Sequence, residues 1–525
     1  MVRAVLALAA MGCAEPTRWR PQLEALDVPS VGVYGVQWVR VEAPYGVPVT
    51  LDVDDGRTAW TVRSERVSEV HELPLLGLGG DRSITVVAHA PDARPSAPLT
   101  FTTPPFPAAA PRVEVLAHVP EAVEPGFLLF GLRANDEGVP SAIVVLDPAL
   151  EPVLWIEADP PVGDLRVGPE GTLLGLVAGD LIERDLCGRV RRHIGPSEFA
   201  AVPLAVPDGL HHELVPLPDN RFVSLSSDTR SVPEYPRSYA DPTPGGPADL
   251  RDQLVVWFDD RGQVSQLQSM ADLLDPTRLG YNGLDSTELG LDWAHANGFA
   301  VDPRDGGVVV SLRHQDALVK LNPDGSLRWI LGDPAGWRPP WADRLLRPVG
   351  TPSWAYHQHA PELHPDGTLL VFDNHNNGAT PYTDRPDAPP TSRVVAWHVD
   401  DLAGTVEHLW SLEQTATGPI YAAVVGDADL QVVTGNVLRN YGILRDDPDG
   451  PSYARVVEQH PDRPDEVLLD LRLSLPGDLA PSGVNLWRVE KIPSLYPVDP
   501  ADVCAPGPAS CCPAASPRRG PSPRR

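Results

Sequence analysis

Long apolar runs, cysteines and nucleotide-binding glycine loops are all scarce in this chain of 525 residues. Beyond the N-terminus no stretch reaches the ~18 consecutive apolar residues that span a bilayer, so membrane attachment is expected through lipid alone. There is no Walker-type or dinucleotide-binding glycine loop, no Gly-x-Ser-x-Gly elbow and no His-Glu-x-x-His helix. The usual signatures of nucleotide-dependent enzymes, α/β-hydrolases and zinc proteases are therefore missing.

Basic residues are also in deficit, with 42 Lys and Arg against 71 Asp and Glu and a formal net charge of −29. A chain of this charge repels the phosphates of nucleic acids and of anionic membranes. We therefore expect no nucleic acid and no membrane surface as partners. The acidity indicates no particular substrate, because a charged exterior mostly promotes solubility.

The chain has five cysteines, and three of them lie close together near the C-terminus. Cys504, Cys511 and Cys512 belong to the segment 498–525, whose Pro, Arg and Cys content cannot support a core. We predict a disordered tail there and leave disulfide pairing open. No histidine accompanies these cysteines, so they do not indicate a metal site.

Residues 1–13 have the pattern of a secretion signal, with Arg3, a short apolar run and small residues before Cys13. Because this arrangement is typical of bacterial lipoproteins, Cys13 is the predicted lipidation site and 14–29 a linker. We expect the protein in the periplasm or at the outer membrane, anchored by lipid. Another exported form and a mis-assigned start codon are the alternatives.

Proline and glycine, in contrast, are abundant, with 61 and 44 residues. They disfavour long helices and favour many short strands joined by turns. Residues 30–104 contain short runs of alternating polar and apolar residues, which indicate a small β-sandwich of fibronectin or immunoglobulin type. On this pattern Val36 and Trp38 face inward on one strand, as do Ile84 and Val86 on another.

From 105 to 497 a two-strand phrase recurs, in which the second strand ends in an Asp, Pro or Gly turn. The copies are PGFLLFGL with AIVVLDPAL, EGTLLGLV with LIERDLCG, DNRFVSLS with LVVWFDDRG, DGGVVVSL with ALVKLNPDG, DGTLLVFD with RVVAWHVDD and, more weakly, DLQVVTGN with YARVVEQ. Roughly six copies predict an all-β fold, a six-bladed β-propeller after the sandwich. An irregular β-solenoid is the alternative, and only 270–278 and 341–347 look helical.

Polar residues occupy equivalent places in several copies. Counting back from the proline of each turn aligns His295 with His357, and Asn297 with His359 and His212. Strand side chains alternate, so residues two apart share one face. Because blades meet around an axis, we expect these side chains to converge at one end of a channel.

Histidines at such a place can act as nucleophiles or general bases, bind a transition metal, or satisfy backbone groups. Their clustering favours a functional role, and His375 joins them because it ends the strand that follows His359. Arg313 and Arg393 lie near strand ends, and a guanidinium suits a tetrahedral oxyanion such as sulfate or phosphate. For either arginine alone, pairing with an acidic loop is the alternative.

Six phrases, DWAHANGFAVDP, SLRHQ, LRWILGDPAGW, LLRPVG, YHQHAPEL and LLVFDN, together resemble the bacterial aryl-sulfate sulfotransferases, or arylsulfotransferases. The resemblance is dense over 290–412 and extends in outline over 30–490. It implies an exported six-bladed propeller with an N-terminal sandwich, often a homodimer, that needs no cofactor. The implied reaction moves a sulfuryl group from an aryl sulfate to a phenol through a sulfated histidine, independently of phosphoadenosine phosphosulfate.

The resemblance also implies roles for two matched positions. His295 resembles the acid/base or stabilising residue of the family, and His359 the residue that contacts the transferred group. The candidate catalytic residues are thus His295, His357, His359 and His375, and the candidate substrate-binding residues are Asn297, Arg313, His314, Asn374, Arg393 and Arg439. No residue is assigned to a metal.

Two departures from the family pattern are visible. The arginine expected after the FDN phrase is absent, with Gly378 at about its place. The strand VVTGNVLRNYG, where the family has its nucleophilic histidine, contains Leu438 and Arg439 but no histidine.

Three explanations stay open. His357 or His375 is a substitute nucleophile, with Arg439, Arg385 or Arg393 as the oxyanion clamp; transfer is direct, without a covalent intermediate; or the protein is a non-catalytic ligand-binding or scaffold lipoprotein. A metal-dependent funnel is a further alternative, favoured by the additional histidines.

Overall fold

The computed structural model describes residues 19–28, 31–199, 209–376 and 391–504, and these are mostly in strands. Its α-helices have four residues each: α1 (Pro196–Phe199), α2 (Met270–Leu273) and α3 (Pro500–Val503). None of the helices in these ranges is long and apolar enough to cross a bilayer. The two segments expected to be helical form α2 and a 3₁₀ turn, Ala342–Arg344.

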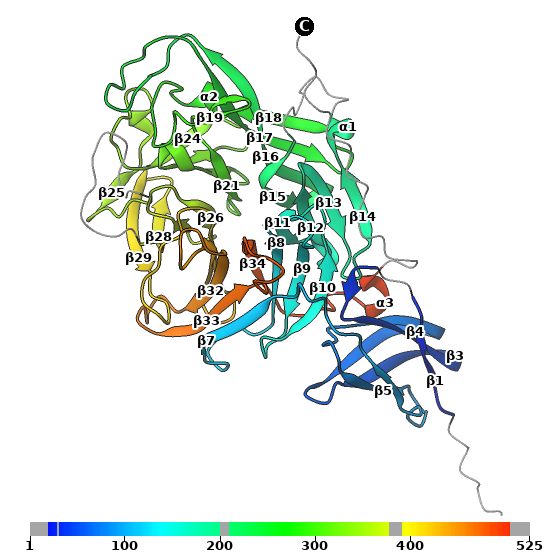
Figure 1. Cartoon of the computed structure of the whole chain (residues 1–525). Coiled ribbons are helices and arrows are strands. Elements are labelled where there is room, and N and C mark those ends of the chain that lie inside the picture. Colours follow the sequence, from blue (N-terminus) through cyan, green and yellow to red (C-terminus); the bar gives the residue numbers. More distant parts are fainter. Residues whose placement is uncertain (1–18, 29–30, 200–208, 377–390, 505–525) are drawn as a thin grey trace, which may run out of the picture.

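Six sheets surround a central axis, which is the arrangement of a β-propeller (Figure 1). The first contains β2 (Val33–Tyr34), β8 (Phe127–Ala134), β9 (Ala142–Leu146), β10 (Pro152–Glu157) and β34 (Val484–Ile492). The second contains β11 (Val162–Val167), β12 (Leu173–Val177), β13 (Asp180–Arg184) and β14 (Val190–Ile194). The third contains β15 (His211–Leu217), β16 (Arg221–Val232), β17 (Ala248–Asp259), β18 (Val264–Ser269), β19 (Ser286–Thr287) and β20 (Gly290–Leu291).

The remaining three propeller sheets follow in chain order. The fourth contains β21 (Ala296–Val301), β22 (Val308–Leu312), β23 (Ala317–Leu321) and β24 (Leu327–Gly332). The fifth contains β25 (Arg347–Val349), β26 (His359–Leu363), β27 (Thr368–Asp373), β28 (Arg393–Asp400) and β29 (Thr405–Leu412). The sixth contains β30 (Asp427–Leu430), β31 (Val437–Leu444), β32 (Tyr453–Gln459), β33 (Val467–Ser474) and β7 (Arg112–His118).

Segments far apart in the chain close the ring of sheets. β34, near the C-terminal end, pairs with β8 in the first sheet, while β7, which precedes β8, pairs with β33 in the sixth. Closure of this kind leaves few open sheet edges and rules out the solenoid alternative. The sixth repeat was misassigned, because the strand that pairs with β32 on one side is β31 (VLRNYGIL) rather than DLQVVTGN.

The strands that line the axis bulge at similar places. Register breaks occur in β11, β15, β21, β26 and β34, near the end of each strand from which the histidines project. Around these breaks the backbone has positive φ at His212 (60°), His295 (50°), His357 (54°) and Arg488 (58°). A bulge redirects side chains locally, so these residues leave the simple alternation that a regular strand imposes.

The N-terminal domain is a separate sheet of β1 (Gln22–Leu26), β3 (Val36–Asp54), β4 (Ala59–Leu76), β5 (Ser83–His89) and β6 (Leu99–Thr102). Ile84 and Val86 are buried in its core, as predicted. The prediction for Val36 and Trp38 was wrong, because Val39 and others of the opposite parity fill that core. Val36 and Trp38 face the propeller instead, and Arg189 lies 5.2 Å over the Trp38 ring.

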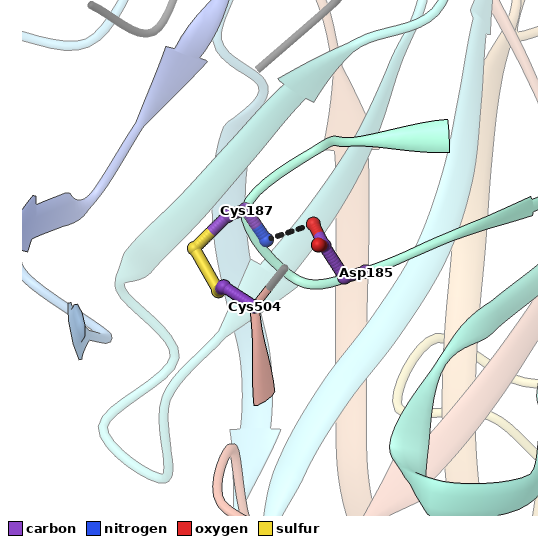
Figure 2. Close-up of side chains that lie close together, drawn as sticks. All are labelled: Asp185, Cys187 and Cys504. Carbon is purple, nitrogen blue, oxygen red and sulfur yellow. Dashed lines mark hydrogen bonds between the residues drawn. A yellow bond between two sulfur atoms is a disulfide. The ribbon is translucent and has the colours of Figure 1, made fainter. Parts of the chain in front are cut away.

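A disulfide between Cys187 and Cys504, 317 residues apart, ties the C-terminal segment to the second propeller sheet (Figure 2). The carboxylate of Asp185 accepts a hydrogen bond from the Cys187 backbone N–H at 3.0 Å in the same turn. Residues 498–504, predicted as part of a disordered tail, instead contain α3 and the buried, paired Cys504. Cys13, Gly378, Arg385, Cys511 and Cys512 lie outside the described residues.

Candidate functional site

A row of imidazole rings crosses one end of the axial channel. His212 lies edge-on to His295, with ring centroids 5.5 Å apart. The ring of His295 stacks on that of His314 with centroids 4.5 Å apart, and the His314 and His357 centroids are 5.9 Å apart. His359 lies near the same centre, where its ring contacts that of Trp487 at 5.7 Å.

Three of these rings have Nδ1 held by a partner while Nε2 is left open in the part of the chain that the structure describes. In His295, Nδ1 lies 2.5 Å from Oδ2 of Asp292. In His359, Nδ1 lies 2.5 Å from Oδ1 of Asn374, whose own amide group donates to the carbonyls of Ala422 and Val425 at 2.8 Å.

The third ring, His212, is held by a neighbouring histidine. Its Nδ1 lies 2.8 Å from Nδ1 of His211, and Nε2 of His211 lies 2.8 Å from Oγ of Ser227. Among the described residues, Nε2 of His212, His295 and His359 has no hydrogen-bond partner. Three imidazoles thus present an open nitrogen at one place.

Burial and nearby guanidinium groups keep these rings neutral. Desolvation lowers the pKa of His295 and His359 well below its ordinary value, and the charge of Arg313 lowers both further. The pKa of His212 falls to about 4, from burial first and then from the charge of Arg251. A neutral imidazole keeps the lone pair that a nucleophile or general base needs.

Arg313 is the cation placed among these rings. It is buried, donates from Nη1 to Nε2 of His314 at 2.9 Å and from Nη2 to the carbonyl of Ala423 at 3.3 Å. His314 in turn donates from Nδ1 to the backbone oxygen of Asp292 at 2.6 Å. One nitrogen of His314 is thus fixed by the Asp292 backbone and the other contacts Arg313, so His314 positions the guanidinium.

Aromatic side chains gather beside the cluster. The ring of Tyr281 lies edge-on to His357 at 5.3 Å and stacks on Tyr239 at 6.3 Å. The positive charge of Arg313 acts on the phenol of Tyr421, although burial is the larger effect and raises its pKa. Tyr239 and Tyr421 are both partly exposed, so flat apolar faces border the cationic group.

A charged layer lies farther along the channel. Arg488 contacts Asp164 at 3.0 Å, Glu213 at 2.5 Å and Asp427 at 3.4 Å, and Arg166 pairs with Glu213 from the other side. A cavity of about 610 Å³ adjoins this layer, and Arg166, Arg488, Asp427 and Glu490 are among its lining residues. Ala360, which follows His359 in the chain, also lines this cavity, so the cavity lies next to the histidine cluster.

Comparison with known proteins decides the family. A family model described as Arylsulfotransferase (ASST) matches residues 141–474. The chain belongs to the arylsulfotransferase family. All of the histidines just described fall within the matched region, and β34 lies beyond it.

Curated arylsulfotransferases match over shorter stretches. Arylsulfate sulfotransferase AssT of Escherichia coli O6:H1 is 31% identical over 161 residues, which cover 27% of this chain and 26% of that protein. AssT of Lelliottia amnigena is 28% identical over 231 residues, covering 35% of this chain and 38% of that protein. The chain thus matches well under half the length of these two relatives.

Solved structures match the chain at low similarity. The periplasmic gluconolactonase PpgL of Pseudomonas aeruginosa is 14% identical with a TM-score of 0.33, and the match covers 70% of this chain and 99% of that one. Virginiamycin B lyase of Staphylococcus aureus is 10% identical with a TM-score of 0.30, covering 70% and 100%. Nothing about chemistry follows from likenesses at this level.

For this arylsulfotransferase-family chain, the histidines proposed as substitute nucleophiles are committed elsewhere. His357 is fully buried, with Nδ1 2.9 Å from Asp316 and Nε2 3.1 Å from Oδ1 of Asn282. Since both acceptors are oxygens, both nitrogens donate and no lone pair is free for attack. His357 therefore fits a structural role better than the nucleophile role.

No contact among the described residues joins His375 to the histidine row, since its one ring contact there is with Tyr356 at 5.7 Å. Two of the candidate arginines serve local structure. His375 and Arg393 both contact Oδ2 of Asp373, at 3.1 and 3.0 Å, so one carboxylate holds the pair. Arg439 is buried in the sixth sheet and donates to the Gln459 side chain at 2.5 Å. No contact within the described ranges joins Arg439 to the histidine row, so of the predicted arginines Arg313 is the one placed at the site.

Asn297 lies beside the row in β21. Its amide group donates to the backbone oxygen of Gln358 at 2.8 Å, and its Oδ1 is buried without a hydrogen-bond partner among the described residues. An open buried acceptor of this kind suits the proton of a hydroxyl group. Asn297 therefore stays among the candidate ligand contacts.

The sequence prediction omitted three participants. His212 aligns with His359 in the repeats but is absent from the predicted site residues. Asp292 lies three residues before His295, and Trp487 lies in the C-terminal strand β34. The alignment of the repeats was enough to find His212. No local pattern indicates Trp487, because its neighbours at the site are more than 100 residues away in the sequence.

One group of residues at the site has ligand atoms close enough for a metal ion. Asp292, His295 and His314 each offer a ligand atom within 4.8 Å of the others. The Asp292 and His295 atoms are, however, 2.5 Å apart and share a hydrogen bond. Two ligands at ~2.0 Å from one tetrahedral ion would be roughly 3.3 Å apart. This arrangement therefore fits an acid–base pair better than a metal centre.

Proposed function

We propose that this protein is an exported aryl-sulfate sulfotransferase that moves a sulfuryl group from an aryl sulfate to a phenol, without phosphoadenosine phosphosulfate. The observation that carries the proposal is the set of three imidazoles with open Nε2 atoms around Arg313. Neutral imidazole can attack sulfur, take the proton of an acceptor phenol, or contact the moving group. A buried guanidinium stabilises the negative oxygens during transfer.

The surroundings of the cluster support an aryl substrate. Tyr281 and Trp487 place aromatic rings beside the imidazoles, and such rings stack on flat apolar ligands. His295 is suited to acid–base work, because Asp292 accepts its Nδ1 proton and leaves Nε2 as the base. Asp292 and His295 thus supply the proton transfer, and Arg313 the charge.

Export and lipid anchoring at Cys13 are part of the same proposal. The disulfide between Cys187 and Cys504 supports export, since disulfides persist mainly in oxidising compartments such as the periplasm. A lipid anchor in the outer membrane and a homodimer are tested by membrane fractionation of Cys13→Ser cells and by the mass of the purified protein in solution.

The activity is tested with p-nitrophenyl sulfate and a series of phenols, with no nucleotide present. We expect p-nitrophenol release that rises with acceptor concentration. In Arg313→Met, kcat/KM should fall by about 100-fold, because one charged contact to the moving group is lost. The exposed Arg344→Met variant is the control and should match the wild type.

A non-catalytic ligand-binding protein is the competing function, favoured by the absence of histidine from β31. It predicts that the wild type binds p-nitrophenyl sulfate or phenols without releasing p-nitrophenol. Binding is followed by the fluorescence of Trp487, with Trp487→Phe as the comparison. Absence of release with every acceptor would decide for this function.

A further inference from the structure

We infer that His212 is the nucleophile of this protein and carries the sulfuryl group, in place of the histidine missing from β31. This inference rests on the proposed sulfuryl transfer. β31 (VLRNYGIL) has no imidazole, whereas β15 contributes one that faces the same row. The reactive group has thus moved from one sheet to another around the axis.

His212 differs from His211, the other histidine of β15, because its Nε2 is open to a ligand. It is half-buried, and its Nε2 has no hydrogen-bond partner in the described part of the chain. Its backbone is fixed in the positive-φ region at 60°, and its carbonyl accepts a hydrogen bond from Nε1 of Trp487 at 3.3 Å. His211, in contrast, has both nitrogens engaged, with His212 and Ser227.

Of the three open imidazoles, His212 is selected by where the Nδ1 proton of the attacking ring can go. Forming an S–N bond at Nε2 makes the ring cationic, so its Nδ1 proton becomes acidic and needs a partner that can take it. The Nδ1 partner of His359 is the amide oxygen of Asn374, which cannot take a proton at neutral pH. The Nδ1 partner of His212 is an imidazole nitrogen of His211, which can.

His295 could also pass on its Nδ1 proton, because its partner is Asp292. The same carboxylate holds the Nδ1 proton and so leaves the Nε2 lone pair open, and that base is needed to activate the acceptor phenol. A sulfated His295 would leave the phenol without a base. Assigning attack to His212 and proton transfer to His295 gives each group one task.

The transfer then balances in two steps. In the first, the aryl S–O bond breaks, the phenoxide leaves with the electron pair, an S–N bond forms to Nε2 of His212, and the Nδ1 proton shifts to His211. In the second, the acceptor phenol gives its proton to Nε2 of His295, and its oxygen attacks sulfur. The S–N electron pair returns to His212, His211 returns its proton, and His295 protonates the next phenoxide that leaves.

Two cations lie near enough to His212 to act on it electrostatically. The charges of Arg251 and Arg313 both act on His212. Arg251 donates from Nε to Oγ of Ser227 at 3.0 Å, the same hydroxyl that contacts His211. Arg251 and the proton relay of His212 therefore belong to one hydrogen-bonded set.

The test combines trapping with rescue by imidazole, on the purified full chain. The wild type is mixed briefly with p-nitrophenyl sulfate and the adduct is mapped to a peptide by mass spectrometry. In His212→Gly, which suits the positive φ, we expect p-nitrophenol release to fall at least about 100-fold. Added imidazole should restore roughly 10-fold of that loss, because it can occupy the space and attack sulfur. The control is His460→Gly, a histidine of the sixth-sheet region outside the cluster, which should keep wild-type activity.

Each outcome of this test either supports or overturns the assignment of His212 as the nucleophile. An adduct on His212, or loss in His212→Gly with imidazole rescue, supports the assignment. Release with an adduct on another residue, a His212→Gly variant of near-normal activity, or a loss that imidazole does not restore overturns it and leaves the proposed function standing. Absence of release by the wild type with all acceptors overturns both.

Discussion

Single nitrogen atoms decide what the histidines of this arylsulfotransferase-family protein can do. A ring held at Nδ1 by an oxygen acceptor has its proton there and its lone pair at Nε2, as in His295 and His359. A ring held at both nitrogens, as in His357, has no lone pair left. Which imidazole can react is therefore decided mainly by the hydrogen-bond partners of its two ring nitrogens and not by the presence of a histidine alone.

Asn374 is the residue through which this rule is tested on His359. Asn374→Ala removes the acceptor of Nδ1, so His359 is no longer fixed in ring orientation and tautomer. We expect kcat to fall about 10- to 30-fold, which corresponds to the loss of one or two kcal/mol of a buried hydrogen bond. The measurement is p-nitrophenol release at saturating donor.

The variant Asn374→Asp shows whether residue 374 acts on His359 through the Nδ1 hydrogen bond or only by filling space. The aspartate keeps an acceptor for Nδ1 but adds a negative charge, which raises the pKa of His359. The acidic limb of the pH–rate profile should therefore move to higher pH than in the wild type. An unchanged profile in Asn374→Asp, or full activity in Asn374→Ala, would contradict the role given to Asn374.

At the scale of elements, the C-terminal segment links the two parts of the molecule. The Asp499 carboxylate accepts from the Ser64 hydroxyl at 3.0 Å, and the Tyr496 hydroxyl accepts from the Leu76 N–H at 2.7 Å. α3 then leads to Cys504, which is bonded to Cys187 in the propeller. The short helix α3 is thus held against β4 of the N-terminal domain and tied to the second propeller sheet (Figure 1).

Removal of the disulfide should loosen this link. We expect the double variant Cys187→Ser and Cys504→Ser to unfold with about 2–5 kcal/mol less free energy, because the unfolded chain is no longer constrained. Thermal or denaturant unfolding measures the difference. Reductant should lower the stability of the wild type toward that of the variant and leave the variant unchanged; equal stability with and without the disulfide would contradict this role of the segment.

Charged side chains lie buried along the axis of the propeller as well as on its surface. Glu490, in the channel, has its pKa raised to about 7, from burial first and then from neighbours that include Asp427. A carboxyl whose folded pKa lies above its unfolded value binds more protons when folded. Its contribution to stability is therefore full below pH 4.5 and is lost as the pH rises through 7.

Glu490→Gln removes this titration. We expect the variant to gain stability relative to the wild type at pH 8 but not at pH 4, with a difference between the two conditions of about 1–3 kcal/mol. Denaturant unfolding at the two pH values measures it. The exposed Glu407→Gln serves as the control and should show a smaller change. A loss of stability at pH 8 in Glu490→Gln would show that its contact with Arg166 outweighs the cost of burial.

The repeated phrases predicted most of the strand pairs because alternation and turn residues are local properties of the chain. The failures have physical causes. Val39 rather than Trp38 fills the N-terminal core, since the propeller offers a second apolar surface to Trp38. His375 and Arg393 were candidates by position, but the buried carboxylate of Asp373 takes both.

By itself the sequence determined the all-β character, the turns, the expectation of a propeller and the resemblance to arylsulfotransferases, because these depend on residue order over short distances. Only the tertiary structure decided which nitrogens are open, that Cys187 pairs with Cys504, and that Trp487 joins His212 and His359. Bulges in the axial strands redirect side chains out of simple alternation, and the partners that fix each imidazole can lie tens of residues away. Such contacts exist only once the ring of sheets has closed.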